Sequence, residues 1–261
     1  MANVFSKLRQ RITGTASGPG SEPTVPENTR IYAIGDIHGR AELLQEIRSR
    51  VVDDAERAAP GTKKIVVYLG DYVDRGLDSQ GVLDALLDPL EGFDSIHLKG
   101  NHEDALLNYL DDYTQGNRWF PIGGDATVLS YGVRVPRGLS PSEREAHLWS
   151  EFQEKLPAKH IEFMRNLDFM YRAGDYLFAH AGVRPGTSID EQDPNDLMWI
   201  RRQFLDSKKD FGAFVVHGHS TAREPEIRNN RIGIDTGAYA TSILTCLVLE
   251  GTTRRFITTQ P

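Results

Sequence analysis

The chain has 261 residues, with 30 lysines and arginines against 37 aspartates and glutamates, a net charge of −7 and one cysteine. This length supports a full hydrophobic core, whereas one cysteine excludes an internal disulfide framework and a cysteine-rich zinc module. The excess of acidic residues argues against a protein that coats nucleic acid in general. The sequence has no run of about 18 apolar residues, so no transmembrane segment is predicted. We therefore expect a folded, cytoplasmic protein without a nucleic-acid polymer as partner.

Residues 1–29 differ in composition from the rest of the chain. The segment 1–12 is short and basic, and 14–28 reads GTASGPGSEPTVPEN, which is typical of a linker. No apolar run of signal-peptide length follows the basic part. A twelve-residue helix is marginal in water, so we expect residues 1–29 to be a disordered tail. A weak membrane-surface or partner-binding role is the alternative.

From residue 30 onward, short apolar runs alternate with helical patterns. The expected strands are 31–34, 64–69, 95–98, 176–179, 213–217, 243–249 and 255–258, and the expected helices are 41–58, 79–87 and 103–111. Strands that alternate with helices predict an α/β domain whose sheets are covered by crossover connections.

The segment from about 113 to 173 breaks this alternation. It contains a glycine pair, a loop rich in Pro, Arg and Ser, and two expected helices at 142–155 and 158–167. We interpret it as a cap-like insertion placed over the site of a single domain that spans 30–261.

Polar clusters follow five of the predicted strands. In chain order they are GDIHG at 35–39, GDYVDRG at 70–76, GNHE at 100–103, HAG at 180–182 and HGH at 217–219. Ligands of open α/β sheets bind at the carboxyl ends of strands, and glycine lets the backbone approach a ligand closely. Five of the eight histidines lie in these clusters, which indicates one shared site.

Aspartate, asparagine and histidine without thiolate are ligands suited to Mn²⁺, Fe or Zn²⁺. Two such ions about 3.5–4 Å apart activate water and stabilise both ends of a displacement at phosphorus. Asp71 follows a predicted strand, and its single carboxylate can bridge two ions. The other candidate ligands are Asp36 and His38 at one ion, and Asn101, His180 and one of His217 or His219 at the second.

Taken together, these five motifs in this order resemble the calcineurin-like metallophosphoesterases. The Asp74-Arg75-Gly76 extension resembles the phosphoprotein phosphatase branch, which includes small bacterial and phage serine/threonine protein phosphatases and symmetrical diadenosine tetraphosphatases. The resemblance covers roughly residues 30–250. It implies an α/β fold, a four-layer sandwich of two mixed β-sheets flanked by helices.

The resemblance also implies a ligand set. Carried over position by position, the ligands of the first metal are Asp36, His38 and Asp71, and those of the second are Asp71, Asn101, His180 and His219. His219 is preferred to His217 because the family places its ligand directly after a glycine. The implied cofactor is a pair of divalent ions, for which we expect Mn²⁺, with Fe or Zn²⁺ as alternatives.

The same resemblance assigns catalytic roles. His102 is the expected general acid, oriented by Asp74, and Arg75 is one phosphate clamp. Arg201 follows a tryptophan by two residues and matches the second clamp, although Arg184 and Arg202 compete for that role. A structural ion pair is the plain alternative for Asp74 and Arg75.

Several neighbouring residues have plainer interpretations. Glu103 is expected to cap a helix, since a carboxylate favours the positive end of the helix dipole. Asp235 is expected to shape the loop behind the site, and Cys246 to lie in the core. No GxxxxGK[ST] motif is present, which excludes a P-loop enzyme.

Three functions compete at this point. The expected one is metal-dependent hydrolysis of phosphoproteins of the serine/threonine type, and the first alternative is hydrolysis of dinucleoside polyphosphates with the same metals. An inactive phosphate-binding scaffold is a remote alternative, because no expected ligand is missing. Residues 119–137 hold an aromatic residue and two arginines, which we expect to contact either a nucleotide or an acidic peptide.

Overall fold

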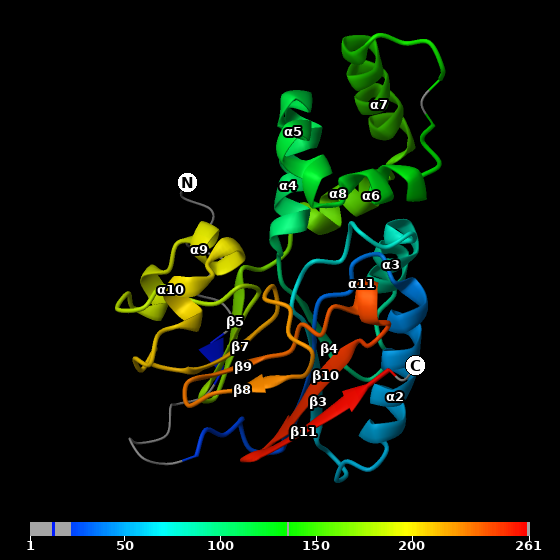
Figure 1. Cartoon of the computed structure of the whole chain (residues 1–261). Helices are drawn as coiled ribbons and strands as arrows, with labels where there is room; N and C mark the ends of the chain where they lie inside the picture. Colours follow the sequence, from blue (N-terminus) through cyan, green and yellow to red (C-terminus); the bar gives the residue numbers. More distant parts are fainter. Residues whose placement is uncertain (1–11, 14–21, 135, 260–261) are drawn as a thin grey trace.

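The computed structural model describes residues 12–13, 22–134 and 136–259 (Figure 1). Most of the expected N-terminal tail therefore lies outside the described residues. In the part of the chain that is described, no helix combines the length and the apolar character needed to cross a membrane.

Two mixed β-sheets form the centre of the molecule. The first has the order β11-β10-β2-β3-β4, with bounds Thr253–Thr258, Thr245–Glu250, Thr29–Ile34, Lys63–Tyr68 and Asp94–His97. The second has the order β1-β5-β6-β7-β9-β8, with bounds Ile12–Thr13, Met170–Ala173, Tyr176–Ala179, Phe214–His217, Arg231–Gly233 and Glu226–Ile227. Strands β2, β3 and β4 run parallel, whereas β10 is antiparallel to β2 and β11.

Alternating side chains of the strands build three apolar layers between four layers of backbone. Ile31 on β2 packs with Phe178 on β6, so this cluster lies between the two sheets. The next residue along β2, Tyr32, faces the other way and packs with Leu44 of the helical layer. Val215 on β7 belongs to a third cluster on the outer face of the second sheet. The predicted four-layer α/β sandwich is confirmed.

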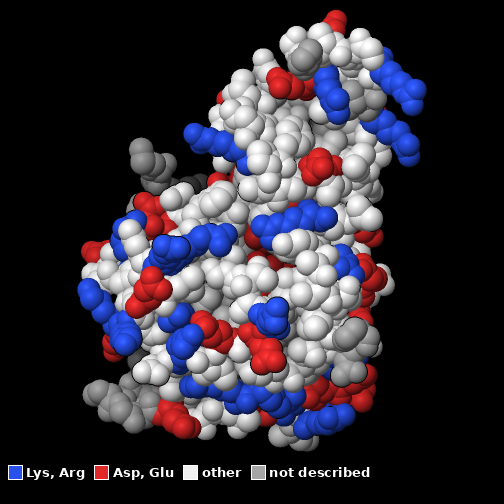
Figure 2. All heavy atoms as spheres, in the orientation of Figure 1, with Lys and Arg blue, Asp and Glu red and all other residues white. Residues whose placement is uncertain are grey.

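Helices cover both outer faces. Beside the first sheet lie α2 (Ala41–Ala55), α3 (Ser79–Leu87) and the start of α4 (Asn101–Asp111) (Figure 1). Beside the second sheet lie η3 (Ile189–Glu191), α9 (Pro194–Trp199) and α10 (Arg202–Leu205). A short helix, α11 (Ala238–Thr241), precedes β10. The helix expected at 41–58 therefore ends three residues earlier. Figure 2 shows basic and acidic side chains interspersed over this face of the molecule.

A helical arm extends from the body between α4 and β5 (Figure 1). It contains η1 (Tyr113–Gln115), α5 (Gly116–Trp119), η2 (Phe120–Ile122), α6 (Gly124–Ser130), α7 (Pro141–Lys155) and α8 (Ala158–Arg165). Trp119 in this arm packs against Phe152 and against Tyr109 of α4, with ring centroids 5.7 and 4.9 Å apart. All three belong to the apolar cluster that also covers the first sheet. The last four residues of the segment expected to be the insertion form β5, and so belong to the second sheet.

A buried ion cluster ties α2 to the first sheet, and it yields a stability prediction. Asp54 accepts hydrogen bonds from the Tyr32 hydroxyl at 2.8 Å and Arg255 Nη2 at 2.5 Å, and Arg30 lies 3.5 Å away. Burial alone would raise the pKa of Asp54, but Arg255, Tyr32 and Arg30 hold that pKa below its usual 3.8. The ionised carboxylate therefore stabilises the fold above about pH 4, and this contribution is lost as the pH falls through the lowered pKa.

We expect Asp54→Asn to lower the free energy of unfolding by about 1–3 kcal/mol at pH 7, because three donors lose a charged acceptor. The difference from the wild type should shrink at pH 3, because the carboxyl is then largely protonated in the unfolded chain and the pH is approaching its lowered pKa in the folded protein. Urea unfolding at the two pH values measures this, with the exposed Asp53→Asn as the matched control. An equal loss at both pH values would contradict the electrostatic explanation.

Candidate dinuclear metal site

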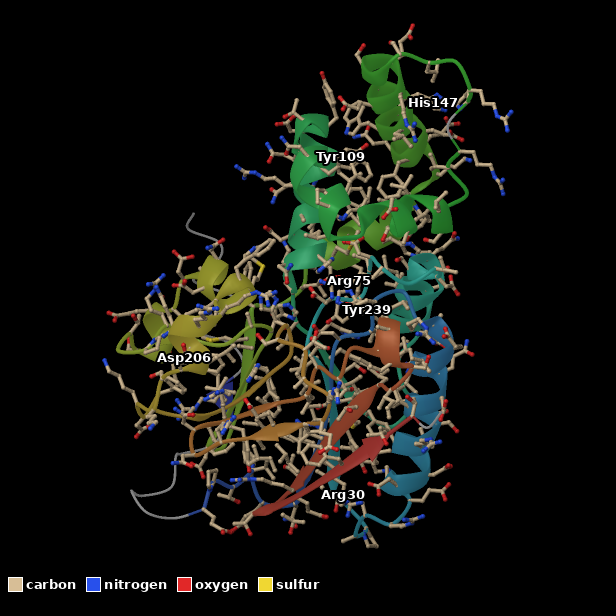
Figure 3. The ribbon with its side chains drawn as sticks, in the orientation of Figure 1. Arg30, Arg75, Tyr109, His147, Asp206 and Tyr239 are labelled. Atoms are coloured by element: carbon tan, nitrogen blue, oxygen red, sulfur yellow. The ribbon has the colours of Figure 1, made fainter. Side chains whose placement is uncertain are left out.

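The five polar clusters follow the carboxyl ends of strands from both sheets, and they converge at the base of the helical arm. Arg75 and Tyr239 mark this place in Figure 3, where they lie next to each other. Two groups of potential metal ligands share one residue there; they are His38, Asp71 and His102, and Asp71, His180 and His219. Within each group the candidate ligand atoms lie within 4.8 Å of one another, and every member is buried.

Asp71 lies between the two groups. Its Oδ2 is 3.5 Å from His38 Nε2, and its Oδ1 is 3.3 Å from His180 Nε2. Burial opposes its charge, but the neighbouring histidines, His180 and His102 foremost, hold the pKa of Asp71 well below its usual range. One ionised carboxylate that faces two ligand groups has the placement required of a bridging ligand.

Two buried polar atoms at the site lack a hydrogen-bond partner among the described residues. Asp36 accepts the His219 amide at 2.9 Å through Oδ2, whereas its Oδ1 is unpartnered. The Nε2 atom of His219 is unpartnered as well. Buried polar groups without partners are rare and costly, and oxygen and imidazole nitrogen are ligands of divalent ions. The residues present therefore fit a metal pair.

The ring nitrogens of the candidate ligands are oriented by the backbone. The Nδ1 atoms of His38 and His180 each lie 2.9 Å from a carbonyl oxygen, of Val73 and Leu69 respectively, and thus their Nε2 atoms face the site. Asn101 Oδ1 is 3.0 Å from His180 Nε2. Burial lowers the pKa of His38 to about 3, and burial together with the charge of His180 keeps the pKa of His219 far below its usual value. Neutral imidazoles bind metals, which suits His38 and His219. Against burial, the Asp71 carboxylate raises the pKa of His180 to about 9, so His180 must release a proton before it binds a metal.

The backbone at the site is held in an uncommon conformation. Among the described residues, seven non-glycine residues have positive φ angles, and five of them belong to the polar clusters: His38 (47°), Asp71 (52°), Asp74 (72°), Arg75 (66°) and His219 (61°). Each such residue costs about 1–3 kcal/mol and persists where the surrounding structure fixes it, often at functional sites.

Gly218 separates His217 from His219 and leaves room for a candidate ligand. A Cβ atom at this position would collide with Asp36 Oδ1. We expect Gly218→Ala to displace the Asp36 carboxylate and to raise the Mn²⁺ concentration needed for half-maximal activity about 10–100-fold. Activity measured against added Mn²⁺ tests this, with the exposed Glu91→Ala, away from the site, as control. An unchanged metal requirement would contradict the proposed role of Asp36.

His102 is held by a carboxylate rather than by a carbonyl. Its Nδ1 lies 2.7 Å from Asp74 Oδ2, and Asp74 also accepts from Trp119 Nε1 at 2.9 Å and Thr127 Oγ1 at 2.6 Å. Burial lowers the pKa of His102, but the carboxylates of Asp71 and Asp74 outweigh burial and raise the pKa above its usual value. The charged form is thus stabilised, as a proton donor requires.

Trp119 corrects one expectation from the sequence. Trp119, the first of three aromatic residues in the segment 119–137, was expected to face a nucleotide or peptide. It is instead fully buried and donates to Asp74, so it positions the His102–Asp74 pair and offers no surface for stacking. The segment's two arginines, Arg134 and Arg137, are exposed on the arm.

Arg75 points its guanidinium into the site. Nη1 lies 2.9 Å from His38 Nε2, Nη2 lies 3.1 Å from His102 Nε2, and the guanidinium lies 4.9 Å from the ring centroid of Tyr239. The two oxygens of Asp74 accept from other groups, which disfavours the ion-pair alternative. A fork of donors at this position suits phosphoryl oxygens.

Arg201 and Arg184 differ in their availability. Arg184 donates to both oxygens of Asp196, at 2.5 and 2.7 Å, so its guanidinium is already paired. Arg201 is exposed immediately before α10, and its charge contributes to the lowered pKa of His219. Of these two arginines, Arg201 is the one whose charge reaches the candidate site.

Glu103 has a larger role than the expected helix cap. Its carboxylate accepts the backbone amides of Gly100, Asp71, Tyr72 and Val73 at 2.7–3.2 Å, so it fixes the loop that carries Asp71. Burial and the charge of Asp71 raise the pKa of Glu103 to about 7. The position of Glu103 at the start of a predicted helix indicated the cap. Nothing in the sequence indicated its contact with the loop about 30 residues earlier.

Comparisons with known proteins agree with this geometry. A family model described as calcineurin-like phosphoesterase matches residues 29–242. A protein named bis(5'-nucleosyl)-tetraphosphatase PrpE [asymmetrical] from Anoxybacillus flavithermus is 26% identical over 239 residues, which cover 82% of this chain and 88% of the relative.

Two solved structures share the fold. One, provisionally assigned as a diadenosine tetraphosphatase, has a TM-score of 0.61 at 19% identity and covers 96% of this chain and 98% of its own. A serine/threonine phosphatase from Saccharomyces cerevisiae has a TM-score of 0.52 at 15% identity, over 100% of this chain and 87% of its own. Identities this low indicate the fold alone.

Proposed function

Since the chain belongs to the calcineurin-like phosphoesterase family and is a hydrolase, we propose that it cleaves a phosphoanhydride bond of dinucleoside polyphosphates. The observation that carries this proposal is the match to a bis(5'-nucleosyl)-tetraphosphatase along 82% of the chain. It favours the alternative weighed from the sequence over the expected phosphoprotein substrate.

The proposed cofactor is a pair of divalent ions, with Mn²⁺ as our choice and Fe or Zn²⁺ as alternatives. The residues that would hold it are Asp36, His38 and Asp71 on one side, and Asp71, Asn101, His180 and His219 on the other. When bound, such ions supply a water of lowered pKa and neutralise charge on the phosphoryl group.

The side chains around the metal site hold the substrate and move one proton. Arg75 and Arg201 bind phosphoryl oxygens through planar pairs of donors. His102, oriented by Asp74, donates a proton from Nε2 to the leaving oxygen. A phosphoanhydride leaves as a weakly basic phosphate, so it needs this proton less than a serine alkoxide does.

Tyr239 supports a nucleotide substrate. The residue is 39% exposed, and its ring lies against the Arg75 guanidinium, with its centroid 5.6 Å from that of the His38 ring. An exposed aromatic ring beside the phosphate clamp is a surface on which a purine base stacks. This residue takes the role that the buried Trp119 cannot fill.

We also propose that residues 30–261 act as one catalytic domain in the cytoplasm. The insertion at about 113–173 would then serve the site by supplying Trp119 and Thr127 to Asp74. Phosphoprotein hydrolysis stays a second candidate, because the His102–Asp74 pair suits a basic leaving group.

The experiment compares two substrates with one enzyme preparation in Mn²⁺. Hydrolysis of diadenosine tetraphosphate and of a phosphoserine peptide is measured side by side, with products separated by chromatography. We expect kcat/KM to be at least about tenfold higher for the dinucleotide, a difference of about 1.4 kcal/mol in activation free energy. The opposite ratio would overturn the proposal in favour of the phosphoprotein substrate.

A further inference from the structure

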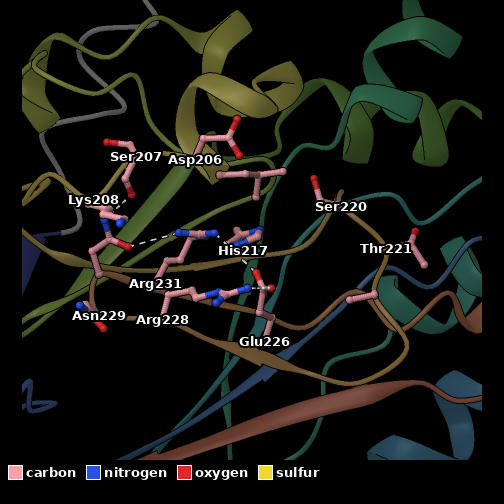
Figure 4. Close-up of a pocket in the computed structure, with 14 residues that line it drawn as sticks. Asp206, Ser207, Lys208, His217, Ser220, Thr221, Glu226, Arg228, Asn229 and Arg231 are labelled. Atoms are coloured by element: carbon pink, nitrogen blue, oxygen red, sulfur yellow. Dashed lines mark hydrogen bonds and ion pairs between the residues drawn. The ribbon is translucent and has the colours of Figure 1, made fainter.

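A cavity of about 660 Å³ lies on the outer face of the second sheet, next to α10 (Figure 4). Its polar lining includes Lys208, His217, Ser220, Glu226, Arg228 and Arg231. The volume is within the range of small-molecule sites, about 300–1,000 Å³.

This cavity is separate from the metal site. On β7, Val216 faces the core between the sheets, whereas Val215 faces the outer cluster. His217 follows the outward direction, and its ring contacts Phe204 with centroids 5.0 Å apart. The chain then turns at Gly218, and His219 enters the metal site. His217 and His219, two residues apart at the end of this strand, thus face different places, the outer cavity and the metal site.

Hydrogen bonds hold the walls of the cavity together. Asn230 Nδ2 donates to the carbonyl oxygens of Ser207 and Lys209, at 3.1 and 2.7 Å, which joins the β8–β9 turn to the segment after α10. The Arg228 amide donates to the Arg231 carbonyl at 2.8 Å and closes that turn. The cavity therefore has a fixed frame rather than being a gap between two independent loops.

Three residues that line this cavity carry buried polar atoms without partners in the described part of the chain. Arg231 and His217 are only 6% and 2% exposed, and among the described residues Arg231 Nε and His217 Nε2 have no hydrogen-bond partner. Ser220 Oγ is unpartnered too. Such atoms are uncommon in native structures, and each indicates a missing partner. Three of them on one cavity indicate a ligand.

The charges of the lining favour an anion. Lys208, Arg228 and Arg231 are cationic, against Asp206 and Glu226, which leaves a net charge of +1 on the five side chains. The Arg231 guanidinium lies 5.6 Å from the ring centroid of Phe204, and burial lowers its pKa, so it has lost part of its hydration. Guanidinium groups in such surroundings bind phosphate well.

His217 adds a requirement for a hydroxyl group. Its Nδ1 is 3.0 Å from the Gly218 carbonyl, which can only accept, so the ring proton lies on Nδ1 and Nε2 is an acceptor. We propose that this cavity binds a phosphorylated, hydroxyl-bearing small molecule, a nucleoside monophosphate or a sugar phosphate. The phosphate meets the arginines and Lys208, and a hydroxyl donates to His217.

Glu226 competes with this ligand. It forms ion pairs with both arginines, through Oε1 with Arg228 Nη2 and through Oε2 with Arg231 Nη2 at 3.5 Å (Figure 4). An incoming phosphate must share these donors with the carboxylate. Removal of the negative charge in Glu226→Gln is therefore expected to tighten binding about threefold or more.

The test is equilibrium binding of AMP and of glucose 6-phosphate to the full chain, with inorganic phosphate and adenosine as comparators. We expect one of the two phosphorylated compounds to bind at least about tenfold more tightly than inorganic phosphate or adenosine. The exposed pair Lys208→Ala/Arg228→Ala should weaken this binding at least about tenfold, and the exposed Arg57→Ala should not.

Hydrolysis of p-nitrophenyl phosphate should stay unchanged in the Lys208→Ala/Arg228→Ala chain, because neither residue touches the metal site. The proposal is overturned if binding survives in this variant and is lost in Arg75→Ala, since the metal site would then be the only site. It is also overturned if neither compound binds more tightly than inorganic phosphate. Both outcomes are independent of the dinucleotide substrate.

Discussion

Asp71→Asn is expected to lower kcat/KM by about 10³-fold or more and to leave at most one tightly bound metal ion per chain. Asp71 is the residue that both ligand groups share, so loss of its charge weakens both halves of the site. Asparagine matches aspartate in shape and tolerates the left-handed backbone found here, with φ at 52°. Its side-chain oxygen can still accept the His102 amide, which lies 3.1 Å from Asp71 Oδ1.

Because the substitution preserves shape, the fold should survive it. Metal content per chain and hydrolysis of p-nitrophenyl phosphate are measured on the same sample, with thermal unfolding as a check of folding. Asp53→Asn removes an equivalent charge from the surface and serves as the control. A folded Asp71→Asn enzyme that retains two ions and most of its activity would contradict the bridging role.

His102→Asn is expected to lower kcat by about 10²–10⁴-fold on substrates with a basic leaving group. The loss should be much larger for phenyl phosphate than for p-nitrophenyl phosphate, whose leaving group needs little protonation. The reason is the contact of His102 with Asp74 at 2.7 Å, which stabilises the protonated ring that donates the proton.

Metal content separates this role from a second one. His102 also lies in one of the two ligand groups, with Nε2 3.7 Å from Asp71 Oδ2. Removal of a general acid should leave both ions bound, whereas removal of a metal ligand should weaken or abolish the binding of one ion. Equal losses on both aryl phosphates together with the loss of one ion would therefore assign His102 to the metal and contradict its role as the acid.

The fold was predictable because its signals are local. Strands such as β2 are short, mostly apolar runs followed by glycine, and the parallel arrangement brings their carboxyl ends to one edge. That geometry explains why Asp36, Asp71 and Asn101, far apart in the sequence, were expected at one site, and the structure places them together. The choice of His219 over His217 came from the family resemblance. In the structure His219 belongs to the group of potential ligands with Asp71 and His180, whereas the His217 ring contacts Phe204 in the outer cluster.

Other features depend on distant contacts that leave no local pattern. Trp119 meets Asp74 across 45 residues, and Glu103 meets the Tyr72 amide across 31. Strands β8 and β9 are only two and three residues long and were not predicted, since their pairing depends on the sheet beside them. The outer cavity next to α10 likewise arises from three segments, which no spacing in the sequence connects.

Anomalous diffraction from crystals grown with Mn²⁺ tests the central claim, a metal pair at the convergence of the five loops. The account predicts two peaks, one on each side of the Asp71 carboxylate, with Asp36 and His38 at the first and Asn101, His180 and His219 at the second. A single peak, or peaks away from Asp71, would contradict it.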